Sequence, residues 1–129
     1  MELAKLTPEL IVNDIKETIA FYRDILDFEL VLTVPNPDNI DWALMSCGGV
    51  EIMFHAKVGH HAGRHVTEDV ISFHFEGSGV KDLYEFVRNK VRIDRHLYPT
   101  FYGTLEFSMR DNNGCTLVFS EKMEQEEDY

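Results

Sequence analysis

The sequence predicts the same run of secondary-structure elements twice. Residues 5–57 and residues 69–121 each show the pattern of one strand, one helix and three further strands, so a βαβββ unit repeats after about 60 residues. Few folds of this size are duplicated in this way. We therefore predict an α+β fold with one domain over residues 1–129, in which two tandem βαβββ modules form curled antiparallel sheets around a cleft.

Each module contains one stretch with the spacing of an amphipathic helix. Asp14 is followed three residues later by Glu17, which is a capping-box pattern, and apolar side chains then recur at helical spacing through residues 15–26. A second apolar stripe predicts a helix near residues 79–90. The run from Asp111 to Gly114 has turn composition, so we expect it to join the last two strands as a hairpin.

Three stretches carry a family resemblance. Residues 12–28 contain V-N-D and then F-Y-R-D-I-L-D-F, with Asp27 where glycine is usual, and residues 41–54 and 102–114 contain the two hairpin patterns. In this order they resemble the vicinal oxygen chelate superfamily of glyoxalases, bleomycin-resistance proteins and extradiol dioxygenases. The resemblance covers residues 5–121, and in character it is closest to the metal-free bleomycin-resistance-like branch.

The resemblance also implies where metal ligands would stand. In the metal enzymes of this superfamily, ligands come from the first and last strands of the modules, and the matching positions here are Thr7, Glu51, Val70 and Val118. Glu51 is the only expected donor, because valine has no lone pair to offer and threonine is a poor ligand beside histidine. We therefore predict neither a family-type metal nor another cofactor.

Strand alternation predicts which side chains share the cleft. The opposite parity is almost wholly hydrocarbon, as at Leu10, Phe54, Phe107 and Leu117, which favours helix packing on that face. The cleft parity mixes apolar, acidic, hydroxyl and imidazole groups, which is typical of a small-molecule pocket. The predicted ligand-binding residues are Glu9, Trp42, Leu44, Glu51, Met53, His55, Ser72, His74, Glu106 and Ser108.

The charge balance restricts the partners. The chain has 23 acidic against 12 basic residues and a formal net charge of −11, and part of this excess lies in the acidic tail 122–129. Such a field repels nucleic acids and favours cationic ligands. No segment has the composition of a membrane span or a signal peptide, so we expect a cytoplasmic protein. By resemblance we expect a homodimer that binds a small cationic or aromatic molecule.

Two other functions remain open. One is an enzyme, a lyase, isomerase or dioxygenase, that uses Glu51, Glu106 and His74 for acid–base chemistry or joins them with His55 in an unconventional metal site. The other is a purely structural domain whose cleft is filled by side chains. The loop histidines at 60, 61 and 65 indicate adventitious metal affinity at most, and Cys47 and Cys115 are expected to be free thiols without a functional role.

Overall fold

The computed structural model of the 129-residue chain describes residues 1–56 and 71–124. The chain divides into two compact units, residues 1–66 and 67–129, and each is described here by itself. No helix in the described part of the chain is long and apolar enough to cross a membrane.

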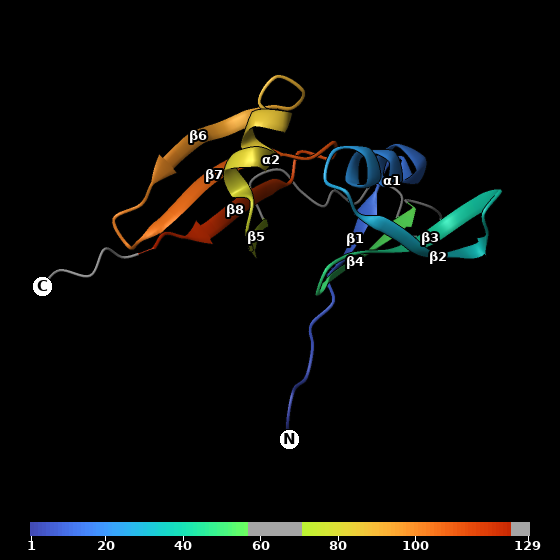
Figure 1. Ribbon diagram of the computed structural model, residues 1–129. Helices are drawn as coiled ribbons and strands as arrows, with labels where there is room; N and C mark the ends of the chain where they lie inside the picture. The colour runs from blue at the N-terminus through green and yellow to red at the C-terminus, as the bar shows by residue number, and fades with distance from the viewer. Residues whose placement is uncertain (57–70, 125–129) are drawn as a thin grey trace, which may run out of the picture. The chain divides into compact units, whose positions relative to one another are not determined.

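The first unit is a four-stranded sheet with one helix on one of its faces (Figure 1). Its elements in chain order are β1 (Glu9–Val12), α1 (Ile15–Asp24), β2 (Glu29–Asn36), β3 (Asn39–Cys47) and β4 (Val50–Ala56). The strand order across the sheet is β1-β4-β3-β2. β1 pairs parallel with β4, and the other neighbours are antiparallel.

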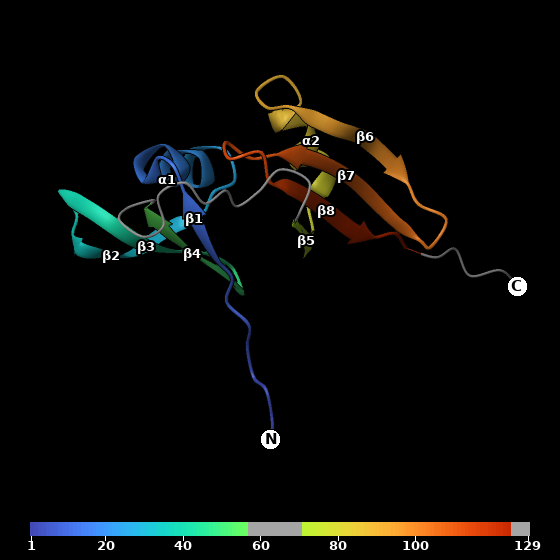
Figure 2. The same ribbon diagram turned by 180° about the vertical axis from the view of Figure 1, so that it is seen from behind.

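The second unit repeats this arrangement, as Figure 2 shows from the other side. Its elements are β5 (Ser72–Glu76), α2 (Val80–Val87), β6 (Ile93–Pro99), β7 (Thr104–Arg110) and β8 (Thr116–Lys122). The strand order is β5-β8-β7-β6, and β5 pairs parallel with β8. The predicted α+β fold with two βαβββ modules is therefore confirmed.

One detail of the fold prediction was wrong, because both sheets are mixed rather than antiparallel. The helix after the first strand of each module returns the chain to the end at which that strand began. The next strand therefore runs in the same direction as the first, and two hairpins later the last strand does so as well. The parallel pair follows directly from this connection.

The helices are shorter than predicted, since α1 ends at Asp24 rather than residue 26 and α2 ends at Val87 rather than residue 90. After α1, Asp27 takes a left-handed conformation with φ of 62° at the position where the family pattern has glycine. Aspartate tolerates this region better than most residues. The chain can therefore turn sharply into β2.

The two helices begin in different ways. Asp14 Oδ1 accepts a hydrogen bond from the Glu17 amide at 3.0 Å, as the capping-box pattern predicted. The residue before α2 is Gly79, which has no side chain to offer. Its place is taken by Glu121 on β8, whose Oε1 accepts a hydrogen bond from the Val80 amide at 3.1 Å. The first turn of α2 therefore depends on the last strand.

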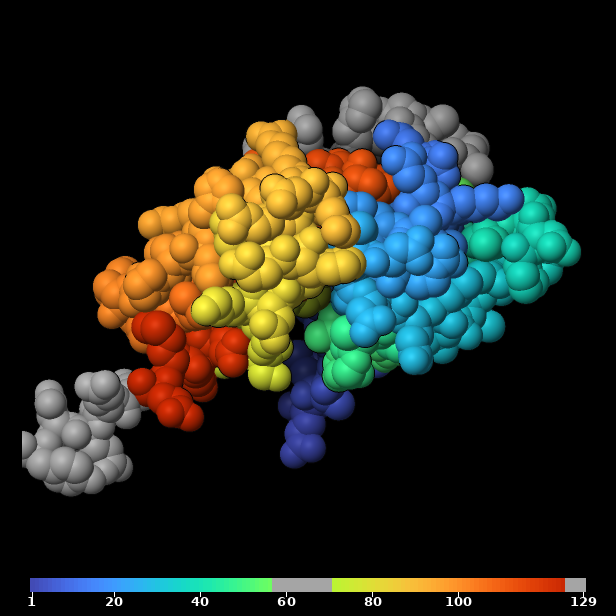
Figure 3. Space-filling model, turned by 45° about the horizontal axis from the view of Figure 1, so that its top comes forward, coloured from blue at the N-terminus to red at the C-terminus, as the bar shows by residue number. Residues whose placement is uncertain are grey.

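The core of each unit lies between its helix and the covered face of its sheet. In the first unit the ring of Tyr22 from α1 lies 4.8 Å from that of Phe54 and 5.4 Å from that of Phe28. In the second unit Tyr84 from α2 lies 5.3 Å from Phe107. Figure 3 shows the outward sides of α1 in blue and α2 in yellow at the surface. Each helix is thus a single layer over its own sheet.

We expect Tyr22→Ala to lower the free energy of unfolding by about 3–5 kcal/mol, the usual cost of removing a fully buried aromatic ring. Tyr22 is 0% exposed, whereas Phe101 is 99% exposed and serves as the matched control. Phe101→Ala should change stability by less than about 0.5 kcal/mol. Urea denaturation followed by circular dichroism measures both values, and equal losses in the two variants would contradict this account of the core.

Candidate functional site

The first sheet has one face that its helix does not cover, and we call it the first open face. Residues paired across neighbouring strands point to the same side of a sheet, so the register defines its rows. One row contains Glu9, Met53, Leu44 and Leu32, and a second contains Ile11, His55, Trp42 and Val34. A third row contains Glu51, Ser46 and Glu29.

The first open face carries apolar groups bordered by charge. Leu32 and Val34 on β2 are 53% and 46% exposed, and Trp42 and Leu44 beside them are half-buried. Glu51 forms an ion pair with Lys5, and Glu9 Oε1 lies 4.0 Å from His55 Nδ1. Within this unit, Glu9, Trp42, Leu44, Glu51, Met53 and His55 therefore lie on one face.

The second sheet also has an uncovered face, the second open face, and it is more polar. Its rows are His74, Val118, Ser108 and Arg95, then Glu76, Ser120, Glu106 and Tyr98, and finally Ser72, Thr116 and Arg110. Ser72, His74, Glu106 and Ser108, the predicted binding residues of this unit, therefore share a face. Ser72 Oγ lies 3.3 Å from His74 Nε2, and the Arg95 guanidinium lies 3.5 Å from the centre of the Tyr98 ring.

Glu106 is the most buried carboxylate of the second open face, at 8% exposure. Its Oε2 accepts hydrogen bonds from the Tyr102 hydroxyl at 2.5 Å and from Thr104 Oγ1 at 3.2 Å. The hydrogen bond to Glu106 raises the pKa of Tyr102, with smaller contributions from burial and from the carboxylate charge. Tyr102 thus remains a hydrogen-bond donor to the carboxylate across the physiological range.

A pocket of about 500 Å³ opens at this end of the second sheet. Glu76 and Lys122, whose Oε1 and Nζ lie 3.6 Å apart, stand on its wall. The remaining lining residues are Tyr102, Gly103, Thr104, Ser120 and Met123. Two of these, Tyr102 and Thr104, are the hydroxyl donors to Glu106, so the buried carboxylate lies directly behind the pocket wall.

Comparison with known proteins identifies the family. The model of the Glyoxalase/Bleomycin resistance protein/Dioxygenase superfamily matches residues 4–119. The chain belongs to this superfamily. A comparison with curated proteins gave no match.

Solved structures share the fold of this superfamily member at low sequence identity. A protein of unknown function from Agrobacterium tumefaciens str. C58 aligns with a TM-score of 0.76 and 17% identity, over 95% of this chain and 97% of the other. TioX from Micromonospora sp. ML1 gives 0.75 and 19% over 96% and 100%. Lactoylglutathione lyase from Agrobacterium tumefaciens gives 0.66 and 19% over 92% of both chains. These likenesses establish the fold alone.

The superfamily's ligand positions are poor in donors in this chain. Thr7 lies two residues before β1, Glu51 is paired with Lys5, and Val118 lies in the middle of β8. Val70 and the loop histidines lie outside the described residues. A divalent metal requires three or four strong donors, and these positions offer one carboxylate, one hydroxyl and two hydrocarbon side chains. The residues present therefore do not fit the metal of the superfamily's enzymes.

The unconventional metal site remains a hypothesis. Glu51 and His55 belong to the first unit, and His74 and Glu106 belong to the second. Within either unit, no three His, Cys, Asp or Glu side chains of the described residues gather around a point that could hold an ion.

Several residues of the open faces were missed by sequence reasoning. Leu32 and Val34 face the same side as Trp42 because β2 has an irregular register between Leu30 and Leu32, and simple alternation cannot locate such a shift. Tyr102 lies in the turn between β6 and β7, where alternation does not apply. The only signal in the sequence for this contact was that Tyr102 lies four residues before Glu106, which alternation places on the open face.

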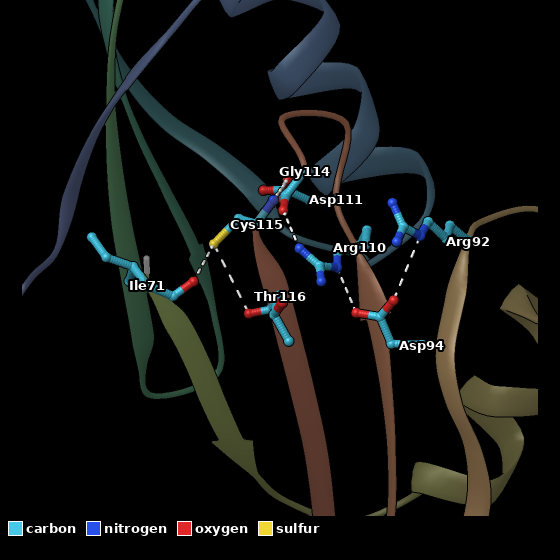
Figure 4. Close-up of polar contacts among 8 residues, drawn as sticks. All are labelled: Ile71, Arg92, Asp94, Arg110, Asp111, Gly114, Cys115 and Thr116. Atoms are coloured by element: carbon cyan, nitrogen blue, oxygen red, sulfur yellow. Dashed lines mark hydrogen bonds and ion pairs between the residues drawn. The ribbon is translucent and has the colours of Figure 1, made fainter. Parts of the chain in front are cut away.

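The opposite end of the second open face is occupied by internal contacts, shown in Figure 4. Arg110 donates from Nε to Asp94 on β6 and from Nη1 to the Gly114 carbonyl at 2.9 Å. Asp111 Oδ1 accepts the amides of Asn113 and Cys115 at 2.8 and 2.9 Å. These contacts stabilise the predicted turn, and they hold the Arg110 side chain in structural interactions.

The two cysteines differ in reactivity for physical reasons. Burial, followed by the charge of Asp111, raises the pKa of Cys115 to about 12, and its Sγ lies 3.6 Å from the Ile71 carbonyl (Figure 4). Cys47 is exposed at the end of β3, although burial and the charges of Asp27 and Glu29 also raise its pKa. Both effects disfavour the thiolate, which is the nucleophilic form.

We expect iodoacetamide at pH 8 to alkylate Cys47 slowly and to leave Cys115 unmodified in the folded protein. With a pKa of about 12, on the order of one Cys115 thiol in ten thousand is ionised at this pH. Peptide mass spectrometry before and after unfolding in urea measures both sites. Rapid modification of Cys115 in the native protein would contradict the assigned burial.

Proposed function

We propose that this chain binds a small cationic aromatic molecule on its open sheet faces, without a metal at the superfamily's usual ligand positions. The proposed binding residues are Glu9, Trp42, Leu44, Glu51, Met53 and His55 on the first face, and Ser72, His74, Glu106 and Ser108 on the second. The observation that carries the proposal is the first open face, where exposed apolar side chains on β2, beside half-buried ones on β3, adjoin carboxylates.

The apolar part of this face suits a flat hydrophobic group. Trp42 is half-buried beside the exposed side chains of Leu32 and Val34, so a planar ligand could remove all three from water. Contiguous exposed hydrocarbon on a folded protein commonly marks an interaction site. An indole face also attracts cations through its quadrupole.

The charged part of this face favours a cation. Glu29 and Glu51 lie in one row on either side of Ser46, and Glu9 lies in the neighbouring row. Lys5 forms an ion pair with Glu51 at a surface position, where such a pair contributes little to stability. A cationic ligand can therefore displace Lys5 at small cost. The net charge of −11 supports the same preference over longer distances.

We expect N-methylacridinium to quench the fluorescence of Trp42, the single tryptophan, and to bind more tightly than acridine, its uncharged counterpart at pH 8. Glu51→Gln should weaken N-methylacridinium binding about three- to tenfold and leave acridine binding unchanged, because one charge interaction is lost. Glu17→Gln, which removes an exposed carboxylate from the start of α1, is the matched control and should have no effect.

Equal binding of the charged and uncharged acridines would contradict the cationic preference. Titration with Zn²⁺, Ni²⁺, Mn²⁺ and Fe²⁺ addresses the alternative, an enzyme with an unconventional metal site. A micromolar or tighter site that is lost in Glu51→Gln, together with a metal-dependent activity, would favour the enzyme over the binding protein.

We also propose that the protein is a homodimer, because β2 is an edge strand with exposed Val31, Leu32 and Val34. Exposed edge strands commonly pair or are covered in stable proteins. Light scattering at micromolar concentration should therefore give twice the monomer mass of 15.0 kDa. A monomer mass across this concentration range would refute the dimer without affecting the binding proposal.

A further inference from the structure

A smaller pocket lies on the helix-covered side of the first sheet, between α1 and the hairpin of β2 and β3, and its volume is about 330 Å³. Leu30 on its wall pairs with Met45, which is fully buried on the covered face, whereas Leu32 pairs with Leu44 on the first open face. The sheet therefore separates this pocket from the face proposed to bind cations. We call it the α1 pocket, and its lining residues are Lys16, Ile19, Arg23, Leu30, Pro37 and Ile40.

Most of the α1 pocket is lined by hydrocarbon. Ile19 on α1 is 4% exposed and forms its deepest part, while Leu30 on β2 is 39% exposed and Ile40 on β3 is half-buried. Pro37 adds its ring from the turn between these two strands. The apolar wall is thus assembled from a helix, two strands and a turn. The hydrocarbon body of a small ligand would remove this wall from water.

The charge at the rim of the α1 pocket is positive, and none of the six lining residues is acidic. Lys16 is exposed in the first turn of α1, and its ammonium group has no hydrogen bond or ion pair with any described residue. The residues three, four and seven positions later, which share its side of the helix, are Ile19, Ala20 and Arg23. No carboxylate of α1 therefore lies on this side to compensate Lys16.

Arg23 contributes less, because its charge is already paired. Its Nε and Nη2 donate to the two carboxylate oxygens of Asp24 at 2.9 and 3.3 Å. Its Nη1 has no hydrogen bond with any described residue, so it can still donate to a ligand. The α1 pocket thus offers one uncompensated cation, Lys16, and one additional donor beside an apolar wall.

We propose that the α1 pocket binds a small hydrophobic carboxylate, with Lys16 as the counter-ion and the aliphatic side chains as the surface for the hydrocarbon body. The net charge of −11 opposes an anion at long range. At physiological ionic strength, however, charges more than about 8 Å away are largely screened, so the nearest group, Lys16, dominates. This site is independent of the proposed function, because it lies on the other side of the sheet and selects the opposite charge.

The test uses 2-naphthoate, which is ionised at pH 7, and the uncharged, nearly isosteric 2-naphthamide as probes of the ¹⁵N-labelled full chain. Naphthoate should shift the amide resonances of Ile19 and Ile40 and bind about two- to fivefold more tightly than the amide, the range that one exposed charge pair contributes. Lys16→Gln should weaken naphthoate binding by this factor and leave naphthamide binding unchanged. Lys81→Gln removes an exposed lysine from the same position of α2 and is the matched control.

A second variant tests the apolar wall. Leu30→Ala should leave the chain folded, because this side chain is 39% exposed. It should weaken naphthoate and naphthamide binding alike, by about two- to fivefold, since both probes lose the same apolar contact. A loss for only one of the two probes would contradict the role of Leu30.

The outcomes for this site and for the proposed function are separate. Shifts at Ile19 and Ile40 with a preference for naphthoate that is lost in Lys16→Gln support the site. Equal binding of the two probes to the wild type, a preference that persists in Lys16→Gln, or shifts confined to the Trp42 indole would each refute it. Quenching of Trp42 by N-methylacridinium should be unchanged in Lys16→Gln, so either proposal can fail without the other.

Discussion

Each sheet in this chain depends on the burial of one hydrocarbon face beneath a single helix. Ile52 and Phe54 on β4, and Phe107 and Met109 on β7, are almost completely removed from water, while their strand neighbours are mostly half-buried. Burial of these side chains supplies the main favourable free energy of each unit. The uncovered face contributes less to that energy, so its residues can vary with function at small cost to the fold.

Glu51 and Glu106, the two carboxylates predicted as candidate catalytic residues, have different surroundings. Glu51 is partly exposed and paired with Lys5, so its charge is already compensated by a flexible side chain. Glu106 is buried and held by the hydroxyls of Tyr102 and Thr104, which orient it but carry no charge. The charge of Glu51 is therefore met by an opposite charge, whereas that of Glu106 is met by neutral donors.

Much of the fold could be predicted because it depends on local patterns. Alternation placed Phe54 and Phe107 on covered faces, the Asp14 cap began α1, and Asp111 formed the turn before β8. The site was harder to predict, because the positions of Leu32, Val34 and Tyr102 depend on irregularities of the backbone. The shifted register in β2 places Leu32 beside Leu44, and a turn directs Tyr102 toward Glu106. Likewise, the Glu121 cap of α2 joins residues 41 positions apart. The alternation of a strand and the 3.6-residue repeat of a helix cannot predict such contacts.

The parallel pairing of the first and last strands in each module has a consequence for biosynthesis. β1 cannot complete its ladder until β4 has been made, and β5 must wait in the same way for β8. The first unit can therefore close while the second is still being translated, since all its strands precede residue 57. The second unit cannot close until Lys122 has left the ribosome, because β8 supplies both the partner of β5 and the cap of α2. During translation the chain therefore passes through a stage with one finished module and one in which β5 has no strand to pair with.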